Sequence, residues 1–117
     1  MNETDLFILL NENPEEFGEF PFLCLVASGG HTDLILMKEH REFELIARTR
    51  DDAAGEAFDK GARILGLKYP GGPEIEKMAE KGNQYSVKFP RPLMKEKNFE
   101  FSFSGLKTSL LYCIKEY

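Results

Sequence analysis

The chain has 117 residues, of which 42% are hydrophobic and 30% charged, as expected for one small soluble globular domain. It shows no apolar stretch of the roughly 20 residues that a membrane span needs, and no basic-then-apolar signal sequence at its N-terminus. Six of the 20 acidic residues lie in residues 1–21, which hold no basic residue, so the remainder carries 15 basic against 14 acidic groups. This balance argues against a stand-alone nucleic-acid binder, and other segments or partners would have to supply a basic surface for RNA.

The first half of the chain predicts three short strands. Residues 5–10 form an apolar run that resembles the end of a helix whose beginning is missing, and an acidic, turn-prone segment follows it. Strands are then predicted at about 22–27, 32–38 and 42–49, the first of them as a buried strand because its run is apolar throughout. Since tight turns join these strands, we expect an antiparallel meander.

A glycine pair ends the first predicted strand. Gly29 and Gly30 have no Cβ that would keep a ligand from the backbone amides, so the hairpin tip after Ser28 could have an opening large enough for a phosphate. Most glycine pairs between strands are simply turns, and this segment alone leaves both interpretations open.

A helix is predicted over about 52–65, with Asp51-Asp52 as its N-cap and Gly66 at its C-terminal end. Its expected core face consists of Ala54, Ala57, Phe58, Gly61, Ala62 and Leu65. A second stripe consists of Asp52, Gly55, Glu56 and Asp59. This stripe is either a solvated acidic face, whose charge Glu56–Lys60 and Asp59–Arg63 pairs would partly neutralise, or a binding site. In the second case Gly55 would let a ligand approach and a carboxylate would bind sugar hydroxyls.

The rest of the chain predicts two more helices. Gly71-Gly72 suggests a flexible turn or a helix connector, and Pro73 would start a helix over about 73–81. Residues 82–100 are expected to be irregular. A last helix is predicted over about 104–117, with an apolar face formed by Leu106, Leu110, Leu111 and Ile114. Lys107, near the start of this helix, could contact an anion or could simply be solvated.

Few side chains suggest covalent or metal chemistry. His31 and His40 lack the spacing of a helical metal site, and Ser28 lacks the strand–turn–helix context of a nucleophile elbow. Cys24 and Cys113 each lie in an apolar run, which favours buried free thiols and a reducing, cytoplasmic setting.

Several blocks of this sequence together carry a family resemblance. They are residues 26–32, 51–60, 65–67 followed by 69–73, 89–92, and 101–108. In this order and spacing they resemble the TsaD glycoprotease-like family, the tRNA N6-adenosine threonylcarbamoyltransferases. The resemblance covers about residues 5–117, and the combination of motifs makes it highly specific.

The resemblance implies an α/β fold, namely the actin-like ATPase (ribonuclease H-like) fold, with residues 1–117 forming the front of its second lobe. The family transfers a threonylcarbamoyl group from threonylcarbamoyl-adenylate to N6 of the adenosine beside the anticodon of tRNA (t6A formation). By motif, the nucleotide or acyl-phosphate part of the substrate would be held by Val26, Ala27, Ser28, Gly29 and Gly30. Asp59 and Gly72 would bind its ribose and adenine side.

The resemblance also implies what this chain lacks. The family's metal ion, iron or zinc, is held by a His-x-x-x-His motif and a distant downstream aspartate, and this chain has neither. We therefore expect no metal or other cofactor bound by this chain alone, and no catalytic residue is assigned. The implied partners are tRNA, threonylcarbamoyl-adenylate and, in bacteria, TsaB-like and TsaE-like proteins. The resemblance implies no contact with a membrane.

Two interpretations of this chain remain. It could be a fragment of a threonylcarbamoyltransferase that keeps one wall of the nucleotide pocket and is inactive alone. It could instead be a non-catalytic actin-like scaffold or partner subunit of the t6A machinery, although a pure scaffold would not need the glycine turn or Asp59. A metalloprotease, as the family's older name suggests, fits poorly because the metal ligands are missing.

Overall fold

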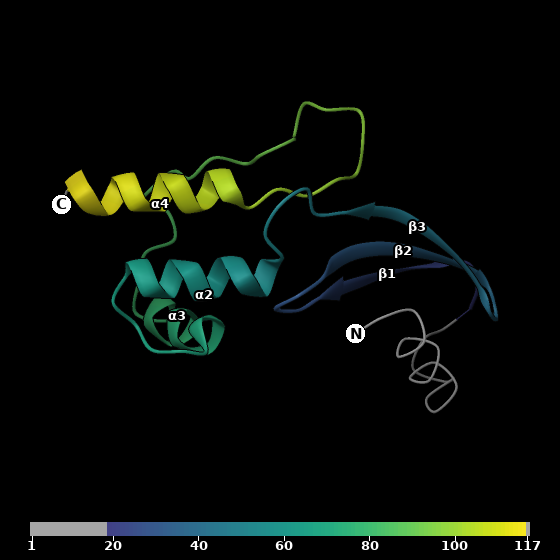
Figure 1. Cartoon of the computed structure of the whole chain (residues 1–117), viewed down its shortest axis with the longest axis horizontal. Helices are drawn as coiled ribbons and strands as arrows, with labels where there is room; N and C mark the ends of the chain where they lie inside the picture. Colours follow the sequence, from purple (N-terminus) through teal and green to yellow (C-terminus); the bar gives the residue numbers. More distant parts are fainter. Residues whose placement is uncertain (1–18, 117) are drawn as a thin grey trace.

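A three-stranded antiparallel sheet precedes the helices along the chain (Figure 1). The computed structural model describes residues 19–116, and the predicted helix end at residues 5–10 lies outside that range. The strands are β1 (Phe22–Ala27), β2 (Thr32–Glu39) and β3 (Glu42–Arg48), in the order β1-β2-β3. Both neighbouring pairs are antiparallel, so the predicted meander is confirmed.

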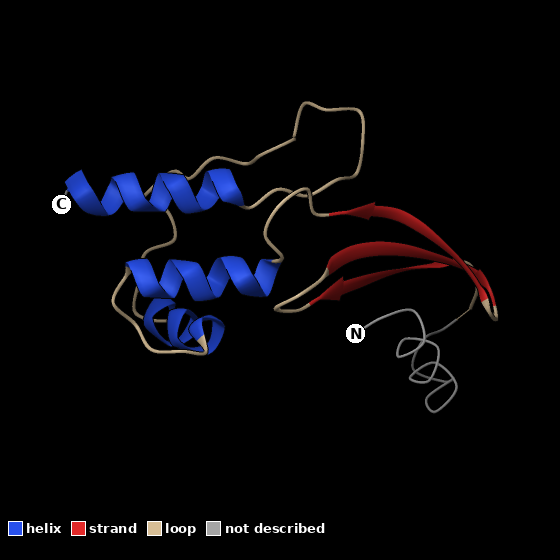
Figure 2. Cartoon of the chain, viewed as in Figure 1, coloured by secondary structure: helices blue, strands red, loops and turns tan. Residues whose placement is uncertain are grey.

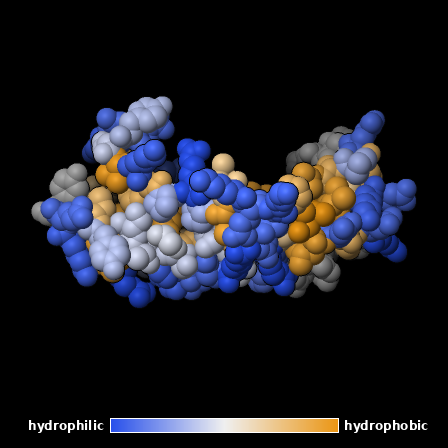
Figure 3. All heavy atoms as spheres, turned by 90° about the horizontal axis from the view of Figure 1, so that it is seen from above, coloured by the Kyte–Doolittle hydropathy of each residue, from blue (hydrophilic) through white to orange (hydrophobic). Residues whose placement is uncertain are grey.

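The sheet buries one face in the described part of the chain. Val26, Ile35 and Met37 are buried there, and partly buried side chains from β1 and β3 pack against them. On the opposite face of β1, Leu23 and Leu25 remain 62% and 60% exposed. The prediction of a buried strand is therefore wrong for half of its side chains, because successive residues of a strand point to opposite faces. Figure 3 shows apolar surface gathered at the sheet end of the molecule.

Three helices follow within residues 19–116, and they lie to one side of the sheet (Figure 2). They are α2 (Ala54–Ile64), α3 (Gly71–Ala79) and α4 (Ser104–Glu116), and α2 contacts both of the others. Gly61 is buried on α2, where a Cβ would lie 3.5 Å from Leu110 of α4 and 3.7 Å from Ile75 of α3. A small residue at this position therefore lets both helices approach α2.

The predicted core face of α2 is only partly covered. Gly61 and Ala62 are buried, whereas Phe58 and Leu65 remain 50% and 40% exposed. Phe58 and Leu65 line an apolar hollow of about 330 Å³, together with residues of α3, α4 and the loop before α4. The end of α2 agrees with its prediction, since Gly66 follows the C-cap residue with a left-handed φ of 73°.

The start of α2 differs from its prediction. The N-cap residue is Ala53, without a side-chain cap bond, and neither Asp51 nor Asp52 caps this helix. Instead, the N–H of Ala54 donates to Oγ1 of the buried Thr32 at 2.8 Å, and the N–H of Gly55 donates to the carbonyl of Ser28 at 2.9 Å. The β1–β2 hairpin thus supplies the acceptors that the first turn of a helix needs, which makes a local aspartate cap unnecessary.

The start of α3 also differs. The predicted flexible turn at Gly71 and Gly72 is wrong, because both residues lie in the first turn of α3. Oδ1 of Asp59 accepts a hydrogen bond from the N–H of Gly71 at 2.8 Å. This bond caps the first turn, so α3 begins at Gly71, two residues before Pro73. Pro73 is tolerated there because an N–H in the first turn would have no intrahelical partner.

A long segment without helix or strand, residues 80–103, connects α3 to α4 and arches away from the helices (Figure 1). It returns beside the end of β3, where Thr49 and Phe101 form an isolated parallel bridge and the N–H of Arg50 donates to the Phe101 carbonyl at 2.9 Å. The Arg50 guanidinium also binds the carboxylates of Glu96 and Glu100, each at 2.6 Å. This segment is therefore tied to the sheet at its C-terminal end.

Candidate functional site

The turn between β1 and β2 is held by Ser28. Its N–H donates to the His31 carbonyl at 2.8 Å, and its Oγ accepts from the N–H groups of Gly30 at 3.3 Å and His31 at 3.1 Å. No atom lies within 4 Å of where a Cβ would stand at Gly29 or at Gly30. The turn therefore has an ordered backbone and an open side from which a ligand could reach the two glycines.

Gly55 has a different role from the one predicted for it. A Cβ at this position would lie 2.7 Å from backbone atoms of Ser28 and Gly29, which is closer than real Cβ contacts allow. The space beside Gly55 is therefore filled by the turn itself, not by a ligand. The missing side chain allows α2 to begin directly against the glycine turn.

Asp59 follows Gly55 by four residues and lies on the same face of α2. One helical turn, roughly 5–6 Å along the axis, separates the two positions. Gly55 contacts the β1–β2 turn, and Asp59 contacts the start of α3. One face of α2 thus brings two distant predicted site segments, residues 26–30 and Gly72, to neighbouring positions.

The seven predicted site residues differ in how accessible they are. Val26 is 7% exposed and belongs to the sheet core, so it can offer a ligand only its backbone. Gly29 and Gly30 are exposed, as is Ala27, whereas Ser28, Asp59 and Gly72 are partly buried. The accessible residues of the predicted loop are therefore Ala27, Gly29 and Gly30.

Asp59 also borders a polar hollow of about 270 Å³ on α2 and the segment that follows it. Its lining comprises Glu56, Asp59, Lys60, Arg63, Leu67, Lys68 and Tyr69. The predicted Glu56–Lys60 pair is confirmed at 2.8 Å. The predicted Asp59–Arg63 pair is wrong among the described residues, since Asp59 instead accepts the bond from Gly71. Carboxylates, cations and an exposed tyrosine ring together suit a polar ligand with hydroxyl or phosphate groups.

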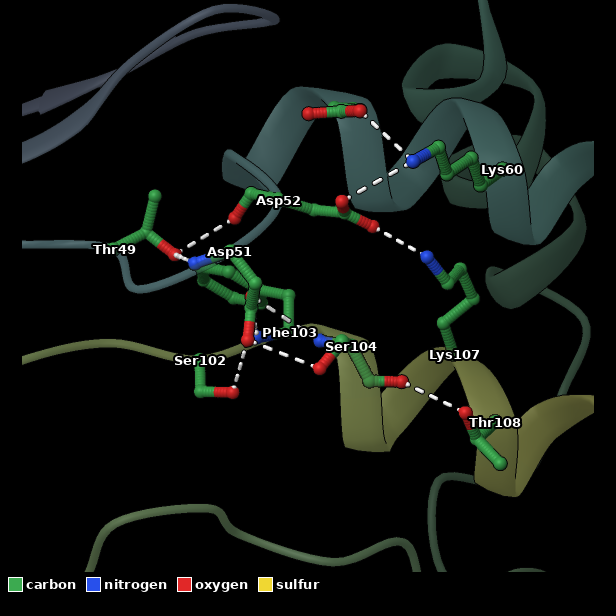
Figure 4. Close-up of polar contacts among 10 residues, drawn as sticks. Thr49, Asp51, Asp52, Lys60, Ser102, Phe103, Ser104, Lys107 and Thr108 are labelled. Atoms are coloured by element: carbon green, nitrogen blue, oxygen red, sulfur yellow. Dashed lines mark hydrogen bonds and ion pairs between the residues drawn. The ribbon is translucent and has the colours of Figure 1, made fainter.

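Asp51 caps α4 instead of α2 (Figure 4). Its Oδ1 accepts from the N–H groups of Phe103 at 2.8 Å and Ser104 at 3.3 Å, and its Oδ2 accepts from the hydroxyls of Ser102 at 2.6 Å and Ser104 at 3.0 Å. Partial desolvation opposes ionisation, but these four bonds, led by the Phe103 N–H, lower the Asp51 pKa to about 2. A residue next to β3 therefore fixes where α4 begins.

Asp52 joins α2 to α4 (Figure 4). Its carboxylate lies 2.7 Å from Nζ of Lys107 on α4 and 3.1 Å from Nζ of Lys60 on α2. The Lys107 hydrogen bond is the largest cause of a lowered Asp52 pKa, desolvation opposes it, and the Lys60 bond adds to the lowering. The interpretation of Lys107 as simply solvated is therefore wrong, and its pairing with a residue 55 positions away left no local signal in the sequence.

We expect Lys107→Met to lower the free energy of unfolding by about 1 kcal/mol. The Asp52 side chain is 13% exposed and that of Lys107 is 28% exposed, so the pair is better shielded than a surface pair. Lys60 still neutralises Asp52 in the variant, which keeps the loss well below that of a buried charge left alone. Urea unfolding measures the difference, with Lys77→Met on the exposed side of α3 as the matched control. Equal losses in the two variants would show that the Asp52 pair contributes nothing.

Within residues 19–116, no three His, Cys, Asp or Glu side chains gather closely enough to hold a metal ion. Cys24 and Cys113 are free and partly buried, and burial raises the pKa of the Cys24 thiol. Among the described helices, none is long and apolar enough to cross a membrane.

The sequence matches one family along almost its whole length. The family model described as "TsaD: tRNA N6-adenosine threonylcarbamoyltransferase" matches residues 4–116. Relatives named tRNA N6-adenosine threonylcarbamoyltransferase are 55% identical in Thermosipho africanus and 60% identical in Kosmotoga olearia, each over 97 residues, and 57% identical in Desulfotalea psychrophila over 106 residues. These alignments cover 83% to 91% of this chain but only 29% to 30% of each relative. The chain thus spans less than a third of the length of these relatives.

Proposed function

The chain belongs to the TsaD family of tRNA N6-adenosine threonylcarbamoyltransferases, and we propose that it supplies one wall of the site that holds the family's adenylate substrate. In this proposal it is the front of the second lobe of an actin-like ATPase fold. The complete enzyme transfers the threonylcarbamoyl group from threonylcarbamoyl-adenylate to N6 of the adenosine beside the anticodon. It works in the cytoplasm on tRNA, with TsaB-like and TsaE-like proteins as partners.

The observation that carries this proposal is the shared face of α2. Gly55 places the glycine turn at one end of that face, and Asp59 places the start of α3 one helical turn away. An extended ligand such as an adenylate, with phosphate at one end and a nucleoside at the other, could lie across both. The open space at Gly29 and Gly30 admits its phosphate, and the polar hollow beside Asp59 admits its sugar hydroxyls.

The chain's own residues would bind and orient this substrate. The turn lies against the N-terminal end of α2, where the helix dipole is positive and favours a phosphate. Asp59 uses Oδ1 to hold the Gly71 N–H, and we propose that Oδ2 accepts hydrogen bonds from ribose hydroxyls.

The metal ion of the complete enzyme, iron or zinc, would be held by residues outside this chain. The described residues form no cluster that fits it, and no step of the proposed role depends on it. In this proposal the chain's share of the reaction is substrate binding and orientation.

Titration calorimetry of the chain with ATP and magnesium tests the proposed wall. We expect the parent chain to bind ATP and Asp59→Ala to bind at least tenfold more weakly, because a ribose contact and the α3 cap are both lost. Asp59→Asn is the matched control, since its amide oxygen can still accept from the Gly71 N–H while the charge is gone.

Two outcomes would contradict the proposal. If Asp59→Asn bound ATP as the parent does and only Asp59→Ala were weak, Asp59 would be a helix cap without a ligand role. If the parent chain bound no ATP, this chain would not form a nucleotide wall by itself.

A further inference from the structure

The segment between α3 and α4 carries a local excess of positive charge that the net charge of −5 of the whole sequence conceals. Between residues 81 and 99 there are five basic side chains and one carboxylate, namely Lys81, Lys88, Arg91, Lys95, Lys97 and Glu96. All six are exposed. The charge excess lies on one continuous loop, in contrast to the mixed charges of the helices.

The single carboxylate of this loop does not neutralise its cations. Glu96 accepts hydrogen bonds from Arg50 at 2.6 Å and from Asn98 at 3.0 Å, and the Arg50 bond is the first cause of its lowered pKa. No ion pair joins Lys88, Arg91, Lys95 or Lys97 to any residue that the structure describes. These four cations are therefore free to meet an anionic partner.

The same loop contains an open hollow of about 840 Å³. Its lining comprises Gln84, Tyr85, Val87, Lys88, Phe89, Pro90 and Arg91. The Tyr85 side chain is 85% exposed, and its backbone is fixed by an N–H bond to Oδ1 of Asn83 at 3.0 Å. A second bond, from the Ser86 N–H to the Asn83 carbonyl at 3.1 Å, closes the turn that contains Tyr85.

This combination of groups has a specific chemical meaning. An exposed ring next to two cations and an amide can stack on an unpaired base, pair with its neighbouring phosphates and bond a base edge. An acidic protein segment would use the cations but would have no need of the ring face. The loop therefore fits single-stranded nucleic acid better than an acidic peptide.

We propose that the loop of residues 81–99 is a contact surface for the unpaired loop of an RNA hairpin. Lys88 and Arg91 pair with its phosphates, and Tyr85 stacks on one of its bases. This inference rests on the proposed function for the identity of the RNA, an anticodon stem-loop of tRNA. The tie from Arg50 to Glu96 and Glu100 holds the C-terminal part of this segment beside the Asp51 turn.

Fluorescence anisotropy with a labelled anticodon stem-loop RNA tests the proposal. We expect the parent chain to bind and Lys88→Glu/Arg91→Glu to bind at least tenfold more weakly. Its salt dependence should also be shallower by about 1.4 in the slope of log K against log salt, since each single-strand phosphate contact contributes about 0.7. Tyr85→Ala should weaken binding about tenfold with an unchanged salt slope, because stacking involves no counterion release.

The matched control is Lys77→Glu/Lys115→Glu, which makes the same charge change on exposed positions of α3 and α4. Equal losses in the control and loop variants would overturn the proposal, as would a parent chain that does not bind the RNA. Polyglutamate that displaces the RNA at equal concentration would also overturn it and would indicate an acidic protein partner.

Calorimetry with ATP on the same variants separates this inference from the proposed function. We expect the loop variants to bind ATP as the parent does, because the loop residues lie outside the predicted nucleotide site. Intact ATP binding with unchanged RNA binding in the loop variants would refute the RNA surface alone. Loss of ATP binding in the parent, with RNA binding retained, would refute the nucleotide wall alone.

Discussion

Gly55→Ala is expected to lower the free energy of unfolding by about 2–3 kcal/mol, the upper range for overpacking a closely packed contact. The new Cβ would stand 2.7 Å from Cα and N of Gly29 and from the carbonyl carbon of Ser28. All three are backbone atoms and cannot rotate away as a side chain could. Either the hairpin turn or the start of α2 must move, and the bond from the Gly55 N–H to the Ser28 carbonyl would lengthen or break.

Gly30→Ala is the matched control for this substitution, because it adds the same methyl group to the same turn. No atom lies within 4 Å of its Cβ position, and its φ is not in the left-handed region. We expect its stability to stay within about 0.5 kcal/mol of the parent. Urea unfolding of both variants measures the contrast, and equal stabilities would show that α2 and the turn are not in close contact.

The same pair of variants separates packing from ligand binding. Gly30→Ala should weaken ATP binding in calorimetry while the fold remains intact, because the added methyl group occupies the open side of the turn. Gly55→Ala should weaken both. ATP binding that is unaffected by Gly30→Ala would contradict a phosphate at this turn.

Asp51→Ala is expected to cost about 2 kcal/mol of folding stability. Loss of one capping side chain typically costs about 1 kcal/mol and at most about 2. Asp51 is at the upper end because it accepts four hydrogen bonds from the segment that begins α4. Because Asp51 is exposed, solvent weakens these bonds, so we do not expect the cost to exceed that range.

Asp51→Asn is the control for charge. Its amide oxygen can still accept from the N–H groups of Phe103 and Ser104, but its amide nitrogen cannot accept from the serine hydroxyls. We expect its folding stability to lie between that of the parent and that of the alanine variant, as measured by thermal unfolding. A loss of less than about 0.5 kcal/mol in Asp51→Ala would show that α4 does not depend on this cap.

The contribution of Asp51 should depend on pH in a defined direction. Its folded pKa of about 2 lies below the ordinary value of 3.8. The lowered pKa means that the ionised form is stabilised by folding, so the contribution is present above about pH 4 and is lost as pH falls toward 2. The stability gap between the parent and Asp51→Ala should therefore shrink through that window, and a gap that widened on acidification would contradict the assignment.

Much of the fold could be predicted from local pattern. Apolar runs joined by short turns indicated the three strands and their antiparallel pairing, and Gly66 marked the end of α2. The glycine turn and Asp59 were selected by motif, and the structure adds that the turn packs against the face of α2 that carries Asp59. What could not be predicted from pattern was how far the core face of α2 is buried, since Phe58 and Leu65 satisfy helical periodicity without being covered in the described residues.

The capping arrangement shows why local prediction stops there. Asp51 and Asp52 precede α2 and have the side chains of an N-cap, so a local rule assigns them to that helix. In the structure the hairpin supplies those acceptors through Ser28 and Thr32, which leaves Asp51 to cap α4 and Asp52 to pair with Lys107. A propensity rule counts only acceptors that are near in sequence. The N–H groups at the start of a helix can donate to any oxygen that the fold brings within reach.

The sequence by itself thus determined the strands, the helical segments and the family of this chain, because these depend on residue type and spacing over short distances. Only the tertiary structure decided which oxygen caps which helix, that Gly55 accommodates the turn instead of a ligand, and that Lys107 pairs with Asp52. These features depend on contacts between residues that are distant in sequence. Chain folding creates such contacts, and no local pattern encodes them.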